Sequence, residues 1–493
     1  MKNIKVTLAC ILLLISSVIS TAQDYLITNF GAVRDGISVN TKAIQAAIDA
    51  ANKNGGGKVL IPTGVFLSGT LVLKDNVELY LAKGAQLLAS ARQEDYPRQP
   101  QPKYRSLRDQ GGWYSFIYAE GATNIAISGN GTIDGQGAKQ KGLPNSLGGD
   151  LDGRPSNILF ISCKKISVSG ITLKNSGMWN QHYLNCEDLT INNINVYNHS
   201  NRNNDGIDID GCRRVILTNS IFDSGDDAIC LKSTGPAPCE NVVISNCVVS
   251  SFCNGIKMGT ESTGGFRNIN ISNCIIKPSI HPEKPKESGN PSAIGITGLS
   301  LEIVDGGVME GISVNNLTIE GTKCPVYIRL GGRNRKHRID APEPTVGSMR
   351  NISISNIIAY GSGNFACSVT GIPGHKIENV KLSNFNIIQQ GGLKEGEYLA
   401  TLEDVGEVIK GYPQPTNWGN LPVSGLFIRH VDKITVNNFS IDADKYDPRP
   451  IFMAQDVNRI SIKDVQVGSN CNSKNMIVMK AVEDHFLEFN RQD

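Results

Sequence analysis

Short segments in which apolar and polar residues alternate recur along most of the chain. The first clear copy begins at Ile166, and others begin at Leu189, Val215, Val242, Ile269, Ile312, Ile352, Val380, Ile434 and Ile460. The most closely spaced copies lie roughly 23 to 28 residues apart. Alternation with period two predicts strands, and repetition of such strands at this spacing predicts a solenoid. The pattern therefore predicts an all-β chain wound into a right-handed parallel β-helix, in which each coil rests on the previous one.

Two residue types recur at fixed places in the repeat. Asparagine is the fifth residue of the unit at Asn193, Asn219, Asn246, Asn273, Asn316, Asn356, Asn384 and Asn438. We expect these side chains to point inward at a bend, to tolerate left-handed backbone and to bond the neighbouring coils. Cysteine stands three residues before the unit at Cys163, Cys186, Cys212 and Cys239, and Cys247 and Cys274 share a second register. We interpret these cysteines as stacked buried thiols rather than disulfides.

The two ends of the solenoid need covers. Helical spacing of apolar residues over Thr41–Asn54, ended by Gly55, predicts an N-terminal capping helix. Short strands are expected around Val59, Leu71 and Val77. The tail past Ile477 is expected to be helical.

The first residues resemble a secretory signal. A positive start is followed by an apolar run and by the small-residue site Ser20–Ala22. We therefore predict a signal peptide over residues 1–22, a single β-helix catalytic domain over residues 23–493, and a periplasmic or extracellular location.

Composition narrows the partners. The chain has 493 residues and a formal net charge of +2, which gives no argument for nucleic acid or an anionic membrane surface. No segment after the signal peptide is apolar enough to predict a membrane span. We expect a monomer that needs no cofactor and no metal and whose partner is its substrate.

Three aspartates, Asp205, Asp226 and Asp227, fall on two successive copies of the repeat. Because coils stack at roughly 4.8 Å, these carboxylates can meet at one spot on one face. Clustered carboxylates repel and raise each other's pKa, which is costly unless they do chemistry. Two alternatives stay open: the aspartates cap turns, or the alternating Asp205, Asp208 and Asp210 hold calcium. Cleavage of a glycosidic bond needs two carboxyl groups across the bond, and a cluster of three can provide them.

The motifs around these acids are similar to those of a known family. Asn203–Gly206 followed by Gly225–Asp227 resembles the Asn-Thr-Asp and Asp-Asp motifs of glycoside hydrolase family 28, the polygalacturonases and their relatives. Other segments that match the family are Phe30–Gly36, Gly69–Leu71, Gly129–Gly135 and Asn175–Trp179. The resemblance runs from about residue 26 to about residue 320.

The resemblance implies an inverting hydrolase of pectin-type chains that contain galacturonic acid, either homogalacturonan or rhamnogalacturonan. By resemblance, Asp226 is the general acid, and Asp205 and Asp227 hold and deprotonate the attacking water. Because neighbours on a regular strand point to opposite faces, Asp226 and Asp227 must lie at a bend if both serve one cleft. Insertions between Ile269 and Ile352 could block the cleft, which suggests exo action.

Two family motifs are not matched. In place of Gly-His-Gly the chain has Cys253–Gly255, so Asn254 replaces a group that could titrate. The Arg-Ile-Lys motif that grips the uronate is not evident, since its expected place near Leu299–Val304 carries no arginine or lysine. Compared with the family, the chain therefore retains the catalytic aspartates but differs in the motifs that recognise the sugar.

Candidate substrate-binding residues follow from these motifs. Cations that could bind a carboxylate are Lys232, Lys257, Arg329 and Arg333, although each could also be an ordinary surface cation. Glu261 could face the cleft and would suit hydroxyl recognition better than uronate binding. Asn203 and Asn254 belong to the motifs themselves. His182 lies one coil before Asp205 and either borders the cleft or packs beside Trp179.

Three other functions fit the same pattern. A polysaccharide lyase on this fold would use calcium and an Arg or Lys base and would release an unsaturated sugar. A non-catalytic carbohydrate-binding or adhesin solenoid would tolerate loss of Asp226. A hydrolase with the same acids could instead act on a sugar that is not a uronate.

Overall fold

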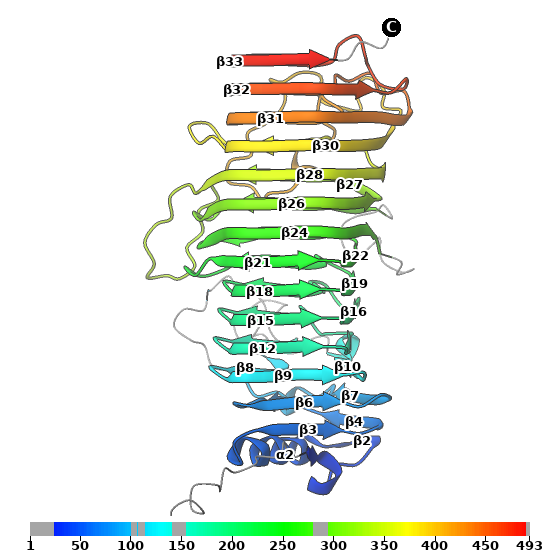
Figure 1. The fold of residues 1–493 in the computed structure, drawn as a ribbon, viewed down its shortest axis with the longest axis vertical. Helices are drawn as coiled ribbons and strands as arrows, with labels where there is room; N and C mark the ends of the chain where they lie inside the picture. The colour runs from blue at the N-terminus through cyan, green and yellow to red at the C-terminus, as the bar shows by residue number, and fades with distance from the viewer. Residues whose placement is uncertain (1–23, 100–105, 107–113, 141–153, 280–293, 490–493) are drawn as a thin grey trace, which may run out of the picture.

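The computed structural model describes residues 24–99, 106, 114–140, 154–279 and 294–489. These residues form a right-handed parallel β-helix whose coils stack along one long axis, as the repeat predicts (Figure 1). The predicted signal peptide lies outside the described residues. Within the described residues, no helix combines the length and the apolar character that a membrane span requires.

The strands pair in parallel into three columns, one per side of the coil. The first column contains β1 (Asp24–Leu26), β3 (Gly57–Ile61), β6 (Val77–Leu81), β9 (Thr123–Gly129), β12 (Lys164–Ser169), β15 (Glu187–Asn192), β18 (Arg213–Thr218) and β21 (Cys239–Ser245). The second contains β2 (Asp35–Val39), β4 (Gly64–Ser68), β7 (Ala85–Ala89), β10 (Thr132–Asp134), β13 (Thr172–Lys174), β16 (Asn195–Asn198), β19 (Ile221–Ser224) and β22 (Val248–Ser251). The third contains β5 (Leu71–Val72), β8 (Ser115–Glu120), β11 (Ser156–Ile161), β14 (Gln181–Leu184), β17 (Ile207–Asp210), β20 (Ile229–Ser233), β23 (Asn254–Ser262), β25 (Gly295–Ile303), β27 (Thr322–Leu330) and β29 (Cys367–Thr370).

Longer strands replace the first two columns in the C-terminal half. They are β24 (Gly265–Pro278), β26 (Val308–Glu320), β28 (Ser348–Ser362) and β30 (Glu378–Gly391). The last three strands also continue the third column: β31 (Leu426–Lys445), β32 (Phe452–Val467) and β33 (Ile477–Phe489). The tail past Ile477 is therefore a strand, and the prediction of a helix there was wrong. Its backbone pairs with β32, which outweighs its weak helical pattern.

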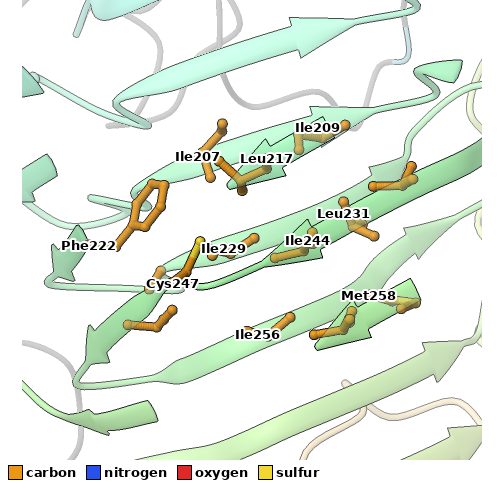
Figure 2. Packing of buried hydrophobic residues seen from close by; sticks show 14 of the residues in the cluster. Ile207, Ile209, Leu217, Phe222, Ile229, Leu231, Ile244, Cys247, Ile256 and Met258 are labelled. Atoms are coloured by element: carbon orange, nitrogen blue, oxygen red, sulfur yellow. The ribbon is translucent and has the colours of Figure 1, made fainter. Parts of the chain in front are cut away.

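The repeat predicted from the sequence is the register of the first column. Ile166 pairs with Leu189, Leu189 with Val215, and the same position continues coil by coil to Ile460. These side chains point into the coil and form one continuous core. Figure 2 shows part of it, where Ile207, Ile229 and Ile256 stack on successive strands of the third column. Each such side chain contributes about 1.5–3 kcal/mol when it is removed from water.

The N-terminal end of the core is covered by α2 (Thr41–Lys53), as predicted (Figure 1). Its buried face consists of Ile44, Ala47, Ile48 and Ala51. Gly55 follows with φ of 92°, a left-handed conformation in which a helix cannot continue. Four short 3₁₀ helices complete the described elements: Ile27–Phe30, Gln93–Asp95, Gly137–Lys139 and Pro415–Asn417.

The asparagines of the repeat have the expected backbone but not the expected direction. All eight have positive φ, for example 56° at Asn246. Their side chains are exposed, so the prediction that they point inward was wrong. They still bond from coil to coil, since the Nδ2 group of Asn246 donates to Oδ1 of Asn219 at 3.3 Å. The repeated cysteines are buried free thiols, as interpreted from the sequence.

Candidate active site

The three aspartates meet at one edge of the third column. Asp205 lies just before β17, and Asp226 and Asp227 lie in a bend between β19 and β20. The backbone N–H of Gly206 donates to the carbonyl of Asp227 at 2.9 Å, which joins the two segments. The predicted bend is what allows both neighbours to serve one cavity.

These side chains line a cavity of about 150 Å³. Among the described residues, its lining is Trp179, Asn203, Asp205, Asp226, Asp227, Lys232, Thr260, Glu261 and Tyr412. Six of the predicted site residues therefore line the cavity: Asn203, Asp205, Asp226, Asp227, Lys232 and Glu261.

Asp227 is held on both carboxylate oxygens. Asn254 donates to Oδ1 at 2.5 Å, and the Lys257 ammonium lies 3.0 Å from Oδ2. Lys257 is 2% exposed, so this ion pair is shielded from water. The same ammonium lies 3.0 Å from the Tyr412 hydroxyl. Lys257 and Asn254 therefore bind the Asp227 carboxylate and are not part of the cavity lining.

Asp205 and Asp226 both favour the protonated form. Burial raises the pKa of Asp205 well above its ordinary value, and the charges of Asp208 and Asp226 add to this. Burial and the neighbouring charge of Asp227 raise the pKa of Asp226, against the opposing effect of Lys257. Since the groups are adjacent, the cluster as a whole retains protons that separate aspartates would lose.

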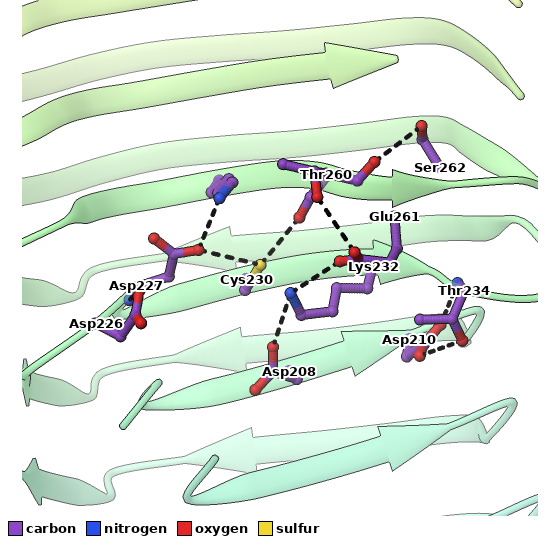
Figure 3. Close-up of polar contacts among 12 residues, drawn as sticks. Asp208, Asp210, Asp226, Asp227, Cys230, Lys232, Thr234, Thr260, Glu261 and Ser262 are labelled. Carbon is purple, nitrogen blue, oxygen red and sulfur yellow. Dashed lines mark hydrogen bonds and ion pairs between the residues drawn. The ribbon is translucent and has the colours of Figure 1, made fainter. Parts of the chain in front are cut away.

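Beside the acids, Lys232 bridges two carboxylates (Figure 3). Its Nζ lies 3.5 Å from Asp208 and 3.4 Å from Glu261. It also lies over the Trp179 ring at 4.7 Å from the ring centre. Lys232 is 5% exposed, so the sequence interpretation of an ordinary surface cation is wrong for this residue.

A cation could be considered at one place among the described residues. Ligand atoms of Asp205, Asp227 and Cys230 lie within 4.8 Å of one another. However, the Lys257 ammonium already places a positive charge against Asp227. The calcium alternative built on Asp205, Asp208 and Asp210 does not fit the geometry, because Asp208 pairs with Lys232 and Asp210 accepts hydrogen bonds from Thr234.

Two predicted binding residues lie away from the cavity. His182 is fully buried, with its Nε2 3.2 Å from Asp210 and its ring edge-on to Trp179, which is the packed alternative. Arg329 is 2% exposed and donates to the backbone carbonyls of Gly371, Glu407 and Val408. Arg329 therefore holds the segment that follows β30 and does not reach the cavity.

That segment also supplies a residue that the sequence does not reveal. Tyr412 lies between β30 and β31, 155 positions from Lys257, yet its hydroxyl contacts the Lys257 ammonium. Thr260 and Trp179 also line the cavity. Thr260 could have been found from its place beside Glu261 on β23, but nothing in the repeat pattern marks Tyr412.

Comparisons with known proteins agree with the fold and the motifs. The family model of glycosyl hydrolases family 28 matches residues 56–400. A probable polygalacturonase of Vitis vinifera is 34% identical over 229 residues, which cover 44% of this chain and 46% of the relative. An exo-poly-alpha-D-galacturonosidase of Dickeya chrysanthemi is 29% identical over 249 residues, with 41% of each covered. The chain thus spans less than half the length of these curated relatives.

Solved structures show the same architecture. An exopolygalacturonase from Thermotoga maritima has a TM-score of 0.61 at 24% identity, covering 75% of this chain and 88% of that one. A family 28 exopolygalacturonase from Yersinia enterocolitica has a TM-score of 0.62 at 19% identity, covering 96% and 79%. At these identities the likeness shows the fold alone.

Proposed function

Because this chain belongs to glycosyl hydrolases family 28, we propose that it hydrolyses a glycosidic bond in pectic chains and inverts the configuration of the sugar. One observation carries the proposal: Asp205, Asp226 and Asp227 line the same small cavity. An inverting hydrolase needs one carboxyl group that is protonated and another that takes a proton from water. A cluster of three aspartates can supply both.

The surroundings of the acids support a division of roles. Burial and the charge of Asp227 raise the pKa of Asp226, which favours the protonated form from which it can donate to the oxygen of the leaving sugar. Asp227, paired with Lys257 and bonded by Asn254, is positioned to take a proton from the attacking water. Asp205 lies beside it in the lining of the same cavity, which supports a role in holding the water.

The substrate class is supported by the named relatives, which are polygalacturonases and exopolygalacturonases. We propose a pectic polysaccharide or oligosaccharide that contains galacturonic acid, either homogalacturonan or rhamnogalacturonan. Exo action is supported by relatives named as exo-acting enzymes and by Tyr412, which lines the cavity from a segment outside the repeat. The segment that carries Arg335, which lies between Ile269 and Ile352 where the sequence places the block, also contacts Glu261 in the lining.

Proton NMR of the first product tests the reaction. Wild-type protein is incubated with defined homogalacturonan and rhamnogalacturonan oligosaccharides, and the newly released sugar is expected in the inverted anomeric form. Asp226→Asn is expected to lower the rate by at least about a hundredfold, since general acid catalysis contributes about 10²–10⁴. Asp188→Asn, a matched change at an exposed ion pair on β15, serves as control. An unsaturated product that disappears with a chelator would instead indicate a lyase.

The proposal also includes exo action, export and a monomeric state. Exo action predicts that reducing ends accumulate while the viscosity of long chains stays high; early mid-chain cuts with a rapid loss of viscosity would contradict it. The N-terminal motif supports export through residues 1–22. We also propose that the protein acts as a monomer, which light scattering would test.

A further inference from the structure

Glu261 on β23 forms part of the cavity wall and is surrounded by cations. Lys232 lies 3.4 Å from its Oε2, and Arg335 donates to its Oε1 at 2.8 Å. Arg333 lies 4.0 Å away. Burial alone would raise the pKa of Glu261, but these three cations outweigh burial and hold its pKa well below the ordinary range. Glu261 therefore presents a charged carboxylate to the cavity.

The cations near the cavity are already committed to carboxylates of the protein. Of the described residues that line the cavity, Lys232 alone is cationic, and it is shared between Asp208 and Glu261. Lys257, behind the lining, is paired with Asp227. Arg333 and Arg335 both contact Asp305 in addition to Glu261.

This arrangement is unfavourable for a sugar that carries a carboxylate. Such a group would lose its water and would face the charges of Glu261 and Asp227 at short range. Each of the cations described above already contacts Glu261, Asp227 or Asp305, so a second carboxylate would compete with an existing contact.

The same wall suits hydroxyl groups. A carboxylate has about four lone-pair sites, and among the described residues Oε2 of Glu261 accepts only the long 3.4 Å bond from Lys232. Sugar hydroxyls can donate to this oxygen. The Trp179 ring in the lining offers an apolar face to the ring carbons.

We propose that the sugar whose anomeric carbon is attacked carries no carboxylate, and that Glu261 determines this specificity by accepting hydrogen bonds from its hydroxyls. The inference rests on the proposed hydrolysis of pectic chains. It assigns galacturonic acid to the leaving side of the bond and a neutral sugar to the cavity. Of the two proposed substrates this favours rhamnogalacturonan, because every ring attacked in homogalacturonan carries a carboxylate.

A matched pair of substrates tests this on wild-type protein. One is a trisaccharide of α-1,4-linked galacturonic acid, and the other is the same trisaccharide with the carboxyl group of its non-reducing terminal ring reduced to an alcohol. Cleavage of the terminal bond is followed by mass. We expect kcat/KM for the reduced compound to be at least about tenfold higher. Equal rates, or a faster reaction of the charged compound, would overturn the inference.

Glu261→Gln provides the second arm, because it keeps the shape of the side chain and removes the charge. The preference for the neutral compound is expected to fall by at least about tenfold. Glu310→Gln is the control, since Glu310 lies on β26 in a surface pair with Arg350. An unchanged preference in a folded Glu261→Gln variant would show that Glu261 does not determine specificity.

Binding separates this inference from the proposed function. Calorimetry on the Asp226→Asn variant with the same two trisaccharides is expected to show tighter binding of the neutral one. Tighter neutral binding without any turnover by the wild type would support the specificity and contradict hydrolysis. Tighter binding of the charged compound together with turnover would support hydrolysis and overturn the specificity, and binding of neither compound would overturn the specificity as well.

Discussion

The outer faces of the first and third columns carry the same kinds of residue in opposite surroundings. On β15 and β18, Glu187 and Asp188 pair with Arg213 and Arg214, whose side chains are 48% and 49% exposed. On β20 and β23, Lys232 and Lys257 pair with Asp208, Glu261 and Asp227, and these two lysine side chains are 6% and 2% exposed. Both faces come from one repeat.

The difference between the faces lies in what covers them. Water surrounds the outer face of the first column, so its ion pairs are screened and each is worth about 0–1 kcal/mol. Segments outside the repeat, including those that carry Tyr412 and Arg335, cover the third column. Charges there are desolvated, so losing one partner is costly and pKa values shift. The two faces carry the same residue types, so burial distinguishes the candidate active site from the exposed face of the first column.

The largest effect is expected when one lysine of the covered face is removed. Lys257→Met should lower the free energy of unfolding by about 3–5 kcal/mol, because it leaves the Asp227 charge buried and unpaired. The matched change Arg214→Met on the exposed face should cost no more than about 1 kcal/mol. Urea unfolding of both variants measures the contrast. Similar costs for the two would show that the faces do not differ energetically.

The two faces should also respond to pH with opposite sign. Burial raises the pKa of Asp208 to about 7, with Lys232 and His182 opposing, whereas the hydrogen bond from Arg213 lowers the pKa of Glu187 to about 2. Asp208 stays protonated in the folded chain while it ionises in the unfolded chain, so its contribution to stability falls as pH rises from about 4 to about 7. Glu187 contributes stability above its ordinary pKa, and this is lost as pH falls towards 2.

Unfolding free energies from pH 2 to pH 8 test this contrast. Relative to the wild type, Asp208→Asn should gain stability as pH rises from 4 to 7. Glu187→Gln should lose its disadvantage as pH falls from about 5 to 2. The same sign of change in both variants would contradict the assignment of one buried and one exposed carboxylate.

A smaller effect is expected at the cover itself. Tyr412→Phe removes the hydroxyl that lies 3.0 Å from the Lys257 ammonium, and a hydrogen bond to a charged group is worth about 1.5–3 kcal/mol. We expect kcat to fall about tenfold and its pH profile to shift, because Lys257 in turn pairs with Asp227. Tyr446→Phe, a change at a side chain that is 56% exposed, is the control. An unchanged pH profile would show that Tyr412 packs against its neighbours without influencing Lys257 and Asp227.

The smallest effect is expected on the exposed asparagines. Asn246→Ala should cost about 1 kcal/mol, since alanine is strained in the left-handed conformation that this residue adopts at φ of 56°. Asn246→Gly should cost less, because glycine adopts that conformation freely. Thermal unfolding compares the two. If glycine is no better than alanine, the bond to Asn219 rather than the backbone explains the asparagine.

Predictions from the sequence succeeded where the repeat itself carries the information. The period-two pattern placed Ile166, Leu189 and their successors in one register, and it brought Asp205 to the segment of Asp226 and Asp227. The family resemblance led to the same acids. Predictions failed for properties that the repeat does not encode, such as the outward direction of Asn246 and the strand at the C-terminal end.

The sequence by itself determined the coil, because alternating side chains and a nearly constant coil length leave the stacked strands one register that buries the apolar positions. It thereby determined which acids become neighbours. Only the tertiary structure decided that Lys232 and Lys257 are buried partners of carboxylates, that Tyr412 reaches the cavity, and that Arg335 reaches Glu261 in its lining. Those contacts join segments far apart in the chain and outside the repeat, and their burial depends on how the covering loops pack.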